Sequence, residues 1–214
     1  PSKKEKKITE YILRFAEEHK LESHVDKAGN VIVRKNATKG MEKRQGVILQ
    51  AHLDMVPQKN SDKVHDFEKD PIESVIDGEW VKANGTTLGS DNGIGIAAAL
   101  AILASKDISH GPLEVLLTID EETGMTGAFG LKKGLLRGDI LMNLDSEDDG
   151  EFNVGCAGGI DVSATGKYEE VKCPAGMVAY EVLMRGLKGG HSGVDIALGR
   201  ANSNKLMFRF LMQA

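Results

Sequence analysis

Strand-like and helix-like segments alternate along the first two thirds of this 214-residue chain, and no other feature restricts its fold more. Three apolar runs typical of buried strands occupy residues 46–54, 113–119 and 139–145. An alanine-rich run typical of a helix, residues 93–105, lies between the first two, and a shorter helical segment, residues 127–136, lies between the last two. Strands that alternate with helices predict an α/β fold, with a mostly parallel sheet flanked by helices.

Further elements are expected around this core. Apolar residues recur at helical spacing over residues 4–20, roughly, which predicts an amphipathic helix. Residues 30–35 are typical of another strand, and residues 73–83 of a hairpin that turns at Asp77-Gly78. We assign residues 1–158 to this first domain, which is incomplete.

The pattern changes after residue 158. Residues 160–168 and 177–186 alternate like half-exposed strands, and residues 201–214 are typical of a helix. This predicts the start of a smaller α+β domain over residues 159–214. The last helix stops with the chain and shows no capping signal at its end, and the start looks clipped, so we expect the chain to be a fragment of a longer protein.

The composition restricts the partners that the chain can have. A formal net charge of −5, with no basic stripe, argues against nucleic acid as a partner. No apolar run approaches a membrane span in length, so no membrane partner is expected. Cys156 and Cys173 are the only cysteines, too few for a disulfide framework, and the N-terminus shows no signal-peptide core. A cytoplasmic location is the simplest interpretation.

Each of the three apolar runs ends in groups that can bind a metal or move a proton. His52 and Asp54 end the first run, the acidic residues 120–122 follow the second, and Asp145 ends the third. In open α/β sheets the ligand site lies beyond the carboxyl ends of the strands, so these groups can converge. Asp91, just ahead of the alanine-rich helix, is a further candidate.

Three adjacent acids repel one another, so either a positive charge lies nearby or the acids lie in open water. We expect a metal centre, with two ions. Carboxylates and imidazole suit zinc, manganese or cobalt, and two cations about 3.5–4 Å apart form a known hydrolytic arrangement. Asp91 is the natural bridge, since a carboxylate has two oxygens. Asp54 lies two residues after His52, on the same face of a strand, and can orient its ring.

The neighbouring residues Glu121 and Glu122 point in different directions and therefore require different roles. One can bind metal while the other acts as general base, and the residues alone leave open which is which. Each feature also has an ordinary structural interpretation. Acidic pairs are usually solvated surface, such histidines are often satisfied in a core, and Asp145 could cap a turn. Only the combination favours a metal site.

Five motifs together carry a resemblance to a known family. They occupy residues 51–58 (AHLDMVPQ), 88–95 (LGSDNGIG), 118–125 (TIDEETGM), 143–148 (NLDSED) and 189–196 (GGHSGVDI). In this order and spacing they resemble the bacterial aminoacyl-histidine dipeptidases. These belong to the di-zinc exopeptidases that include carboxypeptidase G and carnosinase. The resemblance covers nearly the whole chain.

The resemblance implies a role for each of the candidate residues in the first domain. It implies that His52 and Asp145 bind one zinc ion, that Glu122 binds the other and that Asp91 bridges the two. Glu121 would then be the general base.

Three further features are implied in the same way. Asp54 would support His52. His191 would lie in a lid domain, residues 159–214, and help to stabilise the oxyanion of the tetrahedral intermediate. The peptide bond between Asp91 and Asn92 would be cis.

The implied activity is that of a zinc-dependent dipeptidase. It would use zinc-activated water to hydrolyse Xaa-His and other unblocked dipeptides, with manganese or cobalt as substitute ions, and it would form a homodimer through the lid. Family members are about twice as long and supply another zinc-binding histidine beyond residue 214, so we expect this fragment to be inactive alone.

Two alternatives remain at this point. One is a related di-zinc deacylase or carboxypeptidase with the same site and another substrate. The other is a truncated, non-catalytic remnant that binds one metal or serves as a dimerisation module.

Overall fold

The computed structural model describes residues 1–146, 150–156, 158–160, 162–191, 193 and 195–213. The chain divides into two compact units, Pro1–Cys156 and Ala157–Ala214. Parts of the segments discussed above lie outside the described residues, namely Glu147, Asp148, Asp161, Ser192, Val194 and Ala214.

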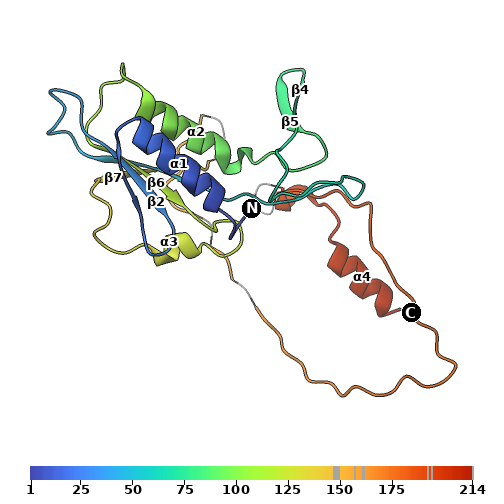
Figure 1. Ribbon diagram of the computed structural model, residues 1–214. Coiled ribbons are helices and arrows are strands. Elements are labelled where there is room, and N and C mark those ends of the chain that lie inside the picture. Colours follow the sequence, from blue (N-terminus) through green and yellow to red (C-terminus); the bar gives the residue numbers. More distant parts are fainter. Residues whose placement is uncertain (147–149, 157, 161, 192, 194, 214) are drawn as a thin grey trace. The chain divides into compact units, whose positions relative to one another are not determined.

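A five-stranded sheet with the order β1-β2-β6-β3-β7 forms the centre of the first unit (Figure 1). Its strands are β1 (Glu22–Val25), β2 (Val31–Lys35), β3 (Val47–His52), β6 (Leu113–Thr118) and β7 (Ile140–Asn143). Strand β3 pairs in parallel with both β6 and β7, in a register that sets Val47 opposite Leu113 and Ile140. These three parallel strands therefore end at the same edge of the sheet.

The sheet is mixed, since β1 and β2 add two antiparallel pairings at one side. The predicted α/β class is confirmed, and the parallel part is confined to β6, β3 and β7. Strand β1 was not expected from the sequence. Its residues are exposed, so it lacks the apolar pattern of a buried strand.

Two helices cover one face of the sheet, α1 (Lys6–Glu18) and α2 (Ser90–Ala104). Successive side chains of a strand point to opposite faces, so alternate strand residues pack under these helices. The larger core cluster joins Ile12 and Ala16 of α1 and Ile96, Ala99 and Leu103 of α2 to Val31, Val33, Leu49, Ala51, Val115 and Leu117 of the strands. In Figure 1 the two helices lie side by side over the strands.

The opposite face buries the intervening strand residues, Ile32, Ile48 and Leu116. They pack against Leu131, Leu135 and Leu136, which follow the short helix α3 (Thr126–Gly130). The predicted helix over residues 127–136 is therefore wrong beyond Gly130. The chain turns to extended backbone at Leu131, and Gly134 has a φ of +84°, which a right-handed helix excludes.

The predicted hairpin forms as the two-stranded sheet of β4 (Ser74–Asp77) and β5 (Trp80–Ala83). Its turn contains Gly78, whose φ of +62° favours glycine.

The second unit contains η1 (Ile196–Leu198) and the helix α4 (Ser203–Leu211). The side chain of Asn202 caps α4 by accepting a hydrogen bond from the Lys205 N–H at 3.0 Å. The strands predicted over residues 160–168 and 177–186 do not form in the described parts of these segments. Ile160 and Val162 are 88% and 84% exposed. An alternating segment becomes a strand only when another strand pairs with it and its apolar face is covered.

In the part of the chain that the structure describes, no helix has the length and apolar character needed to cross a membrane.

Candidate metal centre

Five of the predicted site residues lie together at the edge where the parallel strands end. His52 is the last residue of β3, Glu121 and Glu122 follow β6, and Asp145 follows β7 by two residues. Asp91 comes from the first turn of α2. These residues are far apart in sequence, and the common direction of the three strands brings them together.

His52 is at the centre of this group and is 1% exposed. Its Nε2 atom lies 2.9 Å from Asp91 Oδ1 and 3.7 Å from Asp145 Oδ1. Its Nδ1 atom lies 3.0 Å from the backbone oxygen of Asp54 and 3.4 Å from the Asp54 carboxylate. One ring nitrogen therefore faces two acids, while Asp54 holds the other.

Two sets of side chains have the geometry to hold a metal ion. One is His52, Asp91 and Asp145, and the other is His52, Glu121 and Glu122; in each set the candidate ligand atoms lie within 4.8 Å of one another. The structure thus places Glu122 with Glu121 and His52. A set of one imidazole and carboxylates has the ligand chemistry of zinc.

The acids of this centre carry more negative charge than His52 can compensate. Burial, followed by repulsion from Asp91 and Glu121, raises the pKa of Asp145 to about 6, although His52 opposes the shift. Burial and repulsion from Asp91 likewise raise the pKa of Glu122. Raised pKa values at clustered carboxylates mean that the charged forms are unfavourable without a cation. The residues therefore fit a bound metal ion.

His52 compensates only part of this negative charge. Burial would lower its pKa, but the hydrogen bond with Asp54, the charge of Asp145 and the hydrogen bond with Asp91 outweigh burial and raise the pKa to about 9. Burial opposes ionisation of Asp54 too, yet its hydrogen bonds with His52, Ser2 and two backbone N–H groups hold its pKa far below the usual range. In this form of the centre a proton on His52 takes the place of a cation.

Asp54 holds more than the histidine. Its Oδ1 atom accepts the backbone N–H of Glu121 at 2.9 Å, and its Oδ2 atom accepts that of Glu122 at 3.1 Å. The Ser2 hydroxyl donates to the same Oδ2 atom at 2.7 Å. Asp54 therefore fixes the backbone of both glutamates.

Asp120, the first of the three adjacent acids, belongs to neither candidate set. It is fully buried, with a φ of +54°. Its carboxylate accepts hydrogen bonds from the hydroxyls of Thr123 and Thr126, the latter at 2.7 Å, and these bonds lower its pKa. The acidic run thus separates into one residue that stabilises the turn and two that face the candidate centre.

Asn92 is a residue of the centre that the sequence did not reveal. It is buried, and its side-chain amide donates to Asp145 Oδ1 at 2.6 Å. A Cβ atom on Gly95 would lie 1.9 Å from Asn92 Oδ1, so the glycine leaves room for this amide. The peptide bond between Asp91 and Asn92 is cis, as the family resemblance implied. Its position beside Asp91 was the only signal for Asn92.

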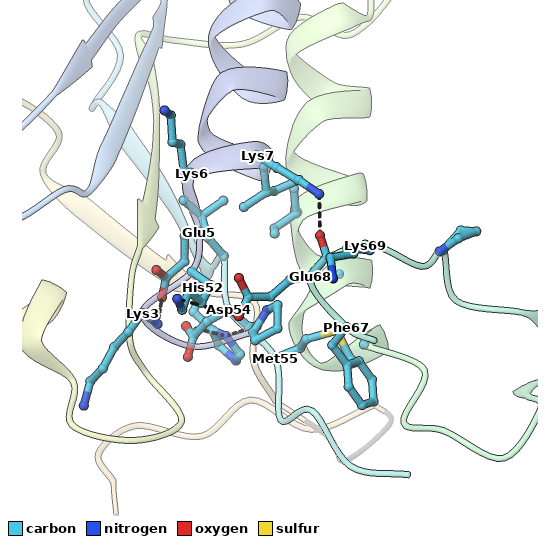
Figure 2. Close-up of a pocket in the computed structure, with 18 of the residues that line it drawn as sticks. Lys3, Glu5, Lys6, Lys7, His52, Asp54, Met55, Phe67, Glu68 and Lys69 are labelled. Carbon is cyan, nitrogen blue, oxygen red and sulfur yellow. Dashed lines mark hydrogen bonds and ion pairs between the residues drawn. The ribbon is translucent and has the colours of Figure 1, made fainter. Parts of the chain in front are cut away.

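Two cavities adjoin the candidate centre. One of about 860 Å³ is lined by His52 and Asp54 together with the N-terminal segment and residues 67–71. Figure 2 shows His52 and Asp54 at this cavity with residues 67–69. The other, of about 290 Å³, is lined by Glu121 and Asp145. His52, Glu121 and Asp145 thus line cavities that small molecules can enter.

His191 lies in the second unit. Its backbone N–H donates to Asp195 Oδ2 at 2.9 Å, and its Nδ1 atom accepts the Gly193 N–H at 3.1 Å. Arg200 pairs with the same Asp195 oxygen at 2.9 Å. These contacts give His191 a defined local setting, and its predicted role towards substrate stays a prediction.

An α/β sheet whose carboxyl edge gathers one histidine and four carboxylates is typical of domains of the metallohydrolase class. The comparison with family models gives the family itself. The chain belongs to peptidase family M20/M25/M40, whose model matches residues 48–192.

Two relatives cover almost the whole chain. It is 57% identical over 211 residues to the cytosol non-specific dipeptidase of Escherichia coli K12. The aligned region covers 99% of this chain and 44% of that protein. The crystal structure of an aminoacylhistidine dipeptidase from Vibrio alginolyticus matches with 55% identity and a TM-score of 0.73, over 99% of this chain and 43% of that one. The chain thus spans less than half the length of these relatives.

A more distant structure shares the fold. The aminopeptidase PepT of Bacillus cereus is 24% identical, with a TM-score of 0.59 over 69% of this chain and 40% of its own.

Proposed function

We propose that the chain is part of a zinc-dependent dipeptidase that hydrolyses Xaa-His and other unblocked dipeptides. One observation carries the proposal: a chain 57% identical to a cytosol non-specific dipeptidase brings His52, Asp91 and Asp145 together as candidate ligands. The names of the two relatives support the dipeptide substrate, and the name of the first supports a cytoplasmic location.

Four residues of the first unit would hold the zinc ions: His52, Asp91, Glu122 and Asp145, with Asp91 as the bridge. Bound zinc would lower the pKa of water and polarise the scissile carbonyl. Manganese or cobalt has similar ligand preferences and could substitute. The raised pKa values of Glu122 and Asp145 support this assignment, because burial and repulsion between the acids disfavour their charged forms and a cation would stabilise them.

Glu121 would act as the general base and accept the proton of the attacking water. It lines the cavity of about 290 Å³ beside Asp145, where a small peptide can approach it. Asp54 would keep Glu121 in place through the 2.9 Å hydrogen bond to its backbone, and would orient His52 at the same time.

Residues 159–214 would be part of a lid and dimerisation domain, in which His191 donates a hydrogen bond to the developing oxyanion. The basis is the family resemblance of the motif around His191, which the family model reaches. A related deacylase or carboxypeptidase, or a non-catalytic remnant, is less well supported, since both relatives that cover 99% of the chain are dipeptidases by name.

The test is a substrate panel and two glutamate variants of the whole protein. We expect zinc by elemental analysis and hydrolysis of dipeptides well above that of tripeptides and N-acylated amino acids. Glu121→Gln should retain zinc and lower kcat by on the order of 10²–10⁴-fold, whereas Glu122→Gln should weaken zinc binding as well. Glu79→Gln, in the exposed turn of the β4–β5 hairpin, is the matched control. Near-normal kcat in Glu121→Gln would refute the general-base assignment.

A further inference from the structure

We infer that the N-terminal segment Ser2–Glu5 is a positioning element of the metal centre, in which Ser2 and Glu5 hold the two loops that carry the ligands and the general base. The inference rests on the proposed function, since it concerns the same site. Neither residue touches the candidate ligand atoms. Ser2 acts through Asp54, and Glu5 acts through Asp120.

Ser2 acts on the loop that follows β3. Its hydroxyl donates to Asp54 Oδ2 at 2.7 Å, across 52 residues of sequence. The same carboxylate contacts the ring of His52 and accepts the backbone N–H groups of Glu121 and Glu122. A rotation of the Asp54 carboxylate would therefore disturb all three residues at once, and the Ser2 hydroxyl opposes that rotation.

Glu5 acts on the loop that follows β6. Its Oε1 atom accepts the backbone N–H of Asp120 at 3.1 Å, across 115 residues of sequence, and that of Lys3 at 2.7 Å. The Lys3 ammonium lies 3.9 Å from Asp120 Oδ1. Asp120 has a φ of +54°, a backbone region that non-glycine residues adopt only when their surroundings hold them there. The contact with Glu5 helps to hold it, directly before Glu121.

These contacts serve the site more than the helix that follows them. Glu5 stands at the N-cap position of α1, yet its side chain makes no capping hydrogen bond to the helix. Glu5 is buried, and a buried carboxylate is costly unless it has hydrogen-bond partners. Its long-range partner is the backbone N–H of Asp120 in the acidic turn. Helix α1 is anchored independently through Ile12 and Ala16 in the core. Figure 2 shows Glu5 and Lys3 next to His52 and Asp54 at the same cavity.

Cobalt binding to the whole protein tests this inference without relying on activity. Co²⁺ would be titrated into the metal-free protein and followed by its visible absorption, whose position and intensity depend on the coordination geometry. Ser2→Ala and Glu5→Ala should each weaken Co²⁺ binding by roughly tenfold and alter the spectrum, as expected for residues that support metal ligands. Ser2→Thr keeps the hydroxyl and should restore both.

Two control variants distinguish this effect from general destabilisation. Ser23→Ala removes an exposed hydroxyl from β1, and Glu10→Ala removes an exposed carboxylate from α1. Both should bind Co²⁺ as the wild type does, and circular dichroism would verify that every variant is folded. Should Glu5→Ala fail to fold, the half-exposed Ser2 still decides the question through its alanine and threonine variants.

The possible outcomes separate this inference from the proposed function. Wild-type affinity and spectrum in Ser2→Ala would overturn the inference and leave the metal centre standing. Failure of Ser2→Thr to restore them would also overturn it, because the hydroxyl contact would not be the cause. A wild-type protein that binds neither Co²⁺ nor Zn²⁺ would overturn the proposed metal centre, and the inference with it.

Discussion

At the scale of single residues, a proton on His52 would compete with a metal ion for the candidate centre. A pKa raised to about 9 means that the imidazole is protonated at neutral pH in the metal-free protein. Nδ1–H then donates to the Asp54 backbone oxygen and Nε2–H to Asp91 Oδ1. A metal ion binds only the deprotonated ring, so it must displace this proton before it can use Nε2.

This competition predicts a pH dependence of zinc affinity. Affinity should rise with pH, at most tenfold per unit, between about 6 and about 9, and level off above about 9 when His52 is already deprotonated. Below about 6 the rise should be steeper, since Asp145 must also lose a proton. Competition with a chelator of known affinity at each pH gives the measurement. A flat affinity between about pH 7 and 9 would contradict the raised pKa of His52.

At the scale of elements, the contact of α3 with the end of β6 fixes the start of the acidic turn. Asn30 links the two by donating to the Gly127 carbonyl at 2.8 Å and accepting the Ile119 N–H at 3.3 Å. A Cβ atom at residue 127 would lie 2.3 Å from Asn30 Oδ1 and 2.7 Å from the Ile119 backbone. Only glycine permits this close approach.

Gly127→Ala should therefore lower the free energy of unfolding by about 1–3 kcal/mol, the usual cost of forcing extra volume into a packed site. Urea denaturation would measure it. Gly166→Ala is the matched control, because a Cβ atom there would meet nothing within 4 Å. The prediction is wrong if both alanine variants are equally stable. Zinc affinity should also fall in Gly127→Ala only, since the turn that carries Glu121 and Glu122 begins at this contact.

At the scale of the whole molecule, the candidate centre joins segments of the first unit that are far apart in the sequence. The N-terminal segment, the ends of three strands and the start of α2 meet there. A ligand that binds only when these segments are assembled stabilises the folded state by mass action. Metal binding at the candidate centre would therefore be coupled to the stability of this unit.

Zinc should accordingly raise the Tm of the protein, and a chelator should lower it again. At a free zinc concentration 100-fold above Kd, the gain is about 2.7 kcal/mol. Differential scanning calorimetry with and without zinc measures the shift, and His52→Ala should abolish most of it. An equal shift in His52→Ala would show that zinc stabilises the protein from elsewhere.

Local patterns in the sequence determined much of this fold. Side-chain patterns among neighbouring residues predicted β3, β6, β7 and the amphipathic helix α1. The hairpin turn depends on the backbone preference of one residue, Gly78. The acids at the strand ends could be recognised for the same reason. Parallel strands share a direction, so their convergence followed once the strands were assigned.

Only the tertiary structure decided the other features of the fold and the site, because these features depend on pairs of residues far apart in the chain. The antiparallel edge strand β1, the inward turn of Asp120 and the contacts of Asn92, Ser2 and Glu5 have no local pattern. The converse holds for residues 160–168 and 177–186, whose alternation predicted strands that the described residues do not form. A strand exists by its hydrogen bonds to another segment, and periodicity within one segment cannot supply that partner.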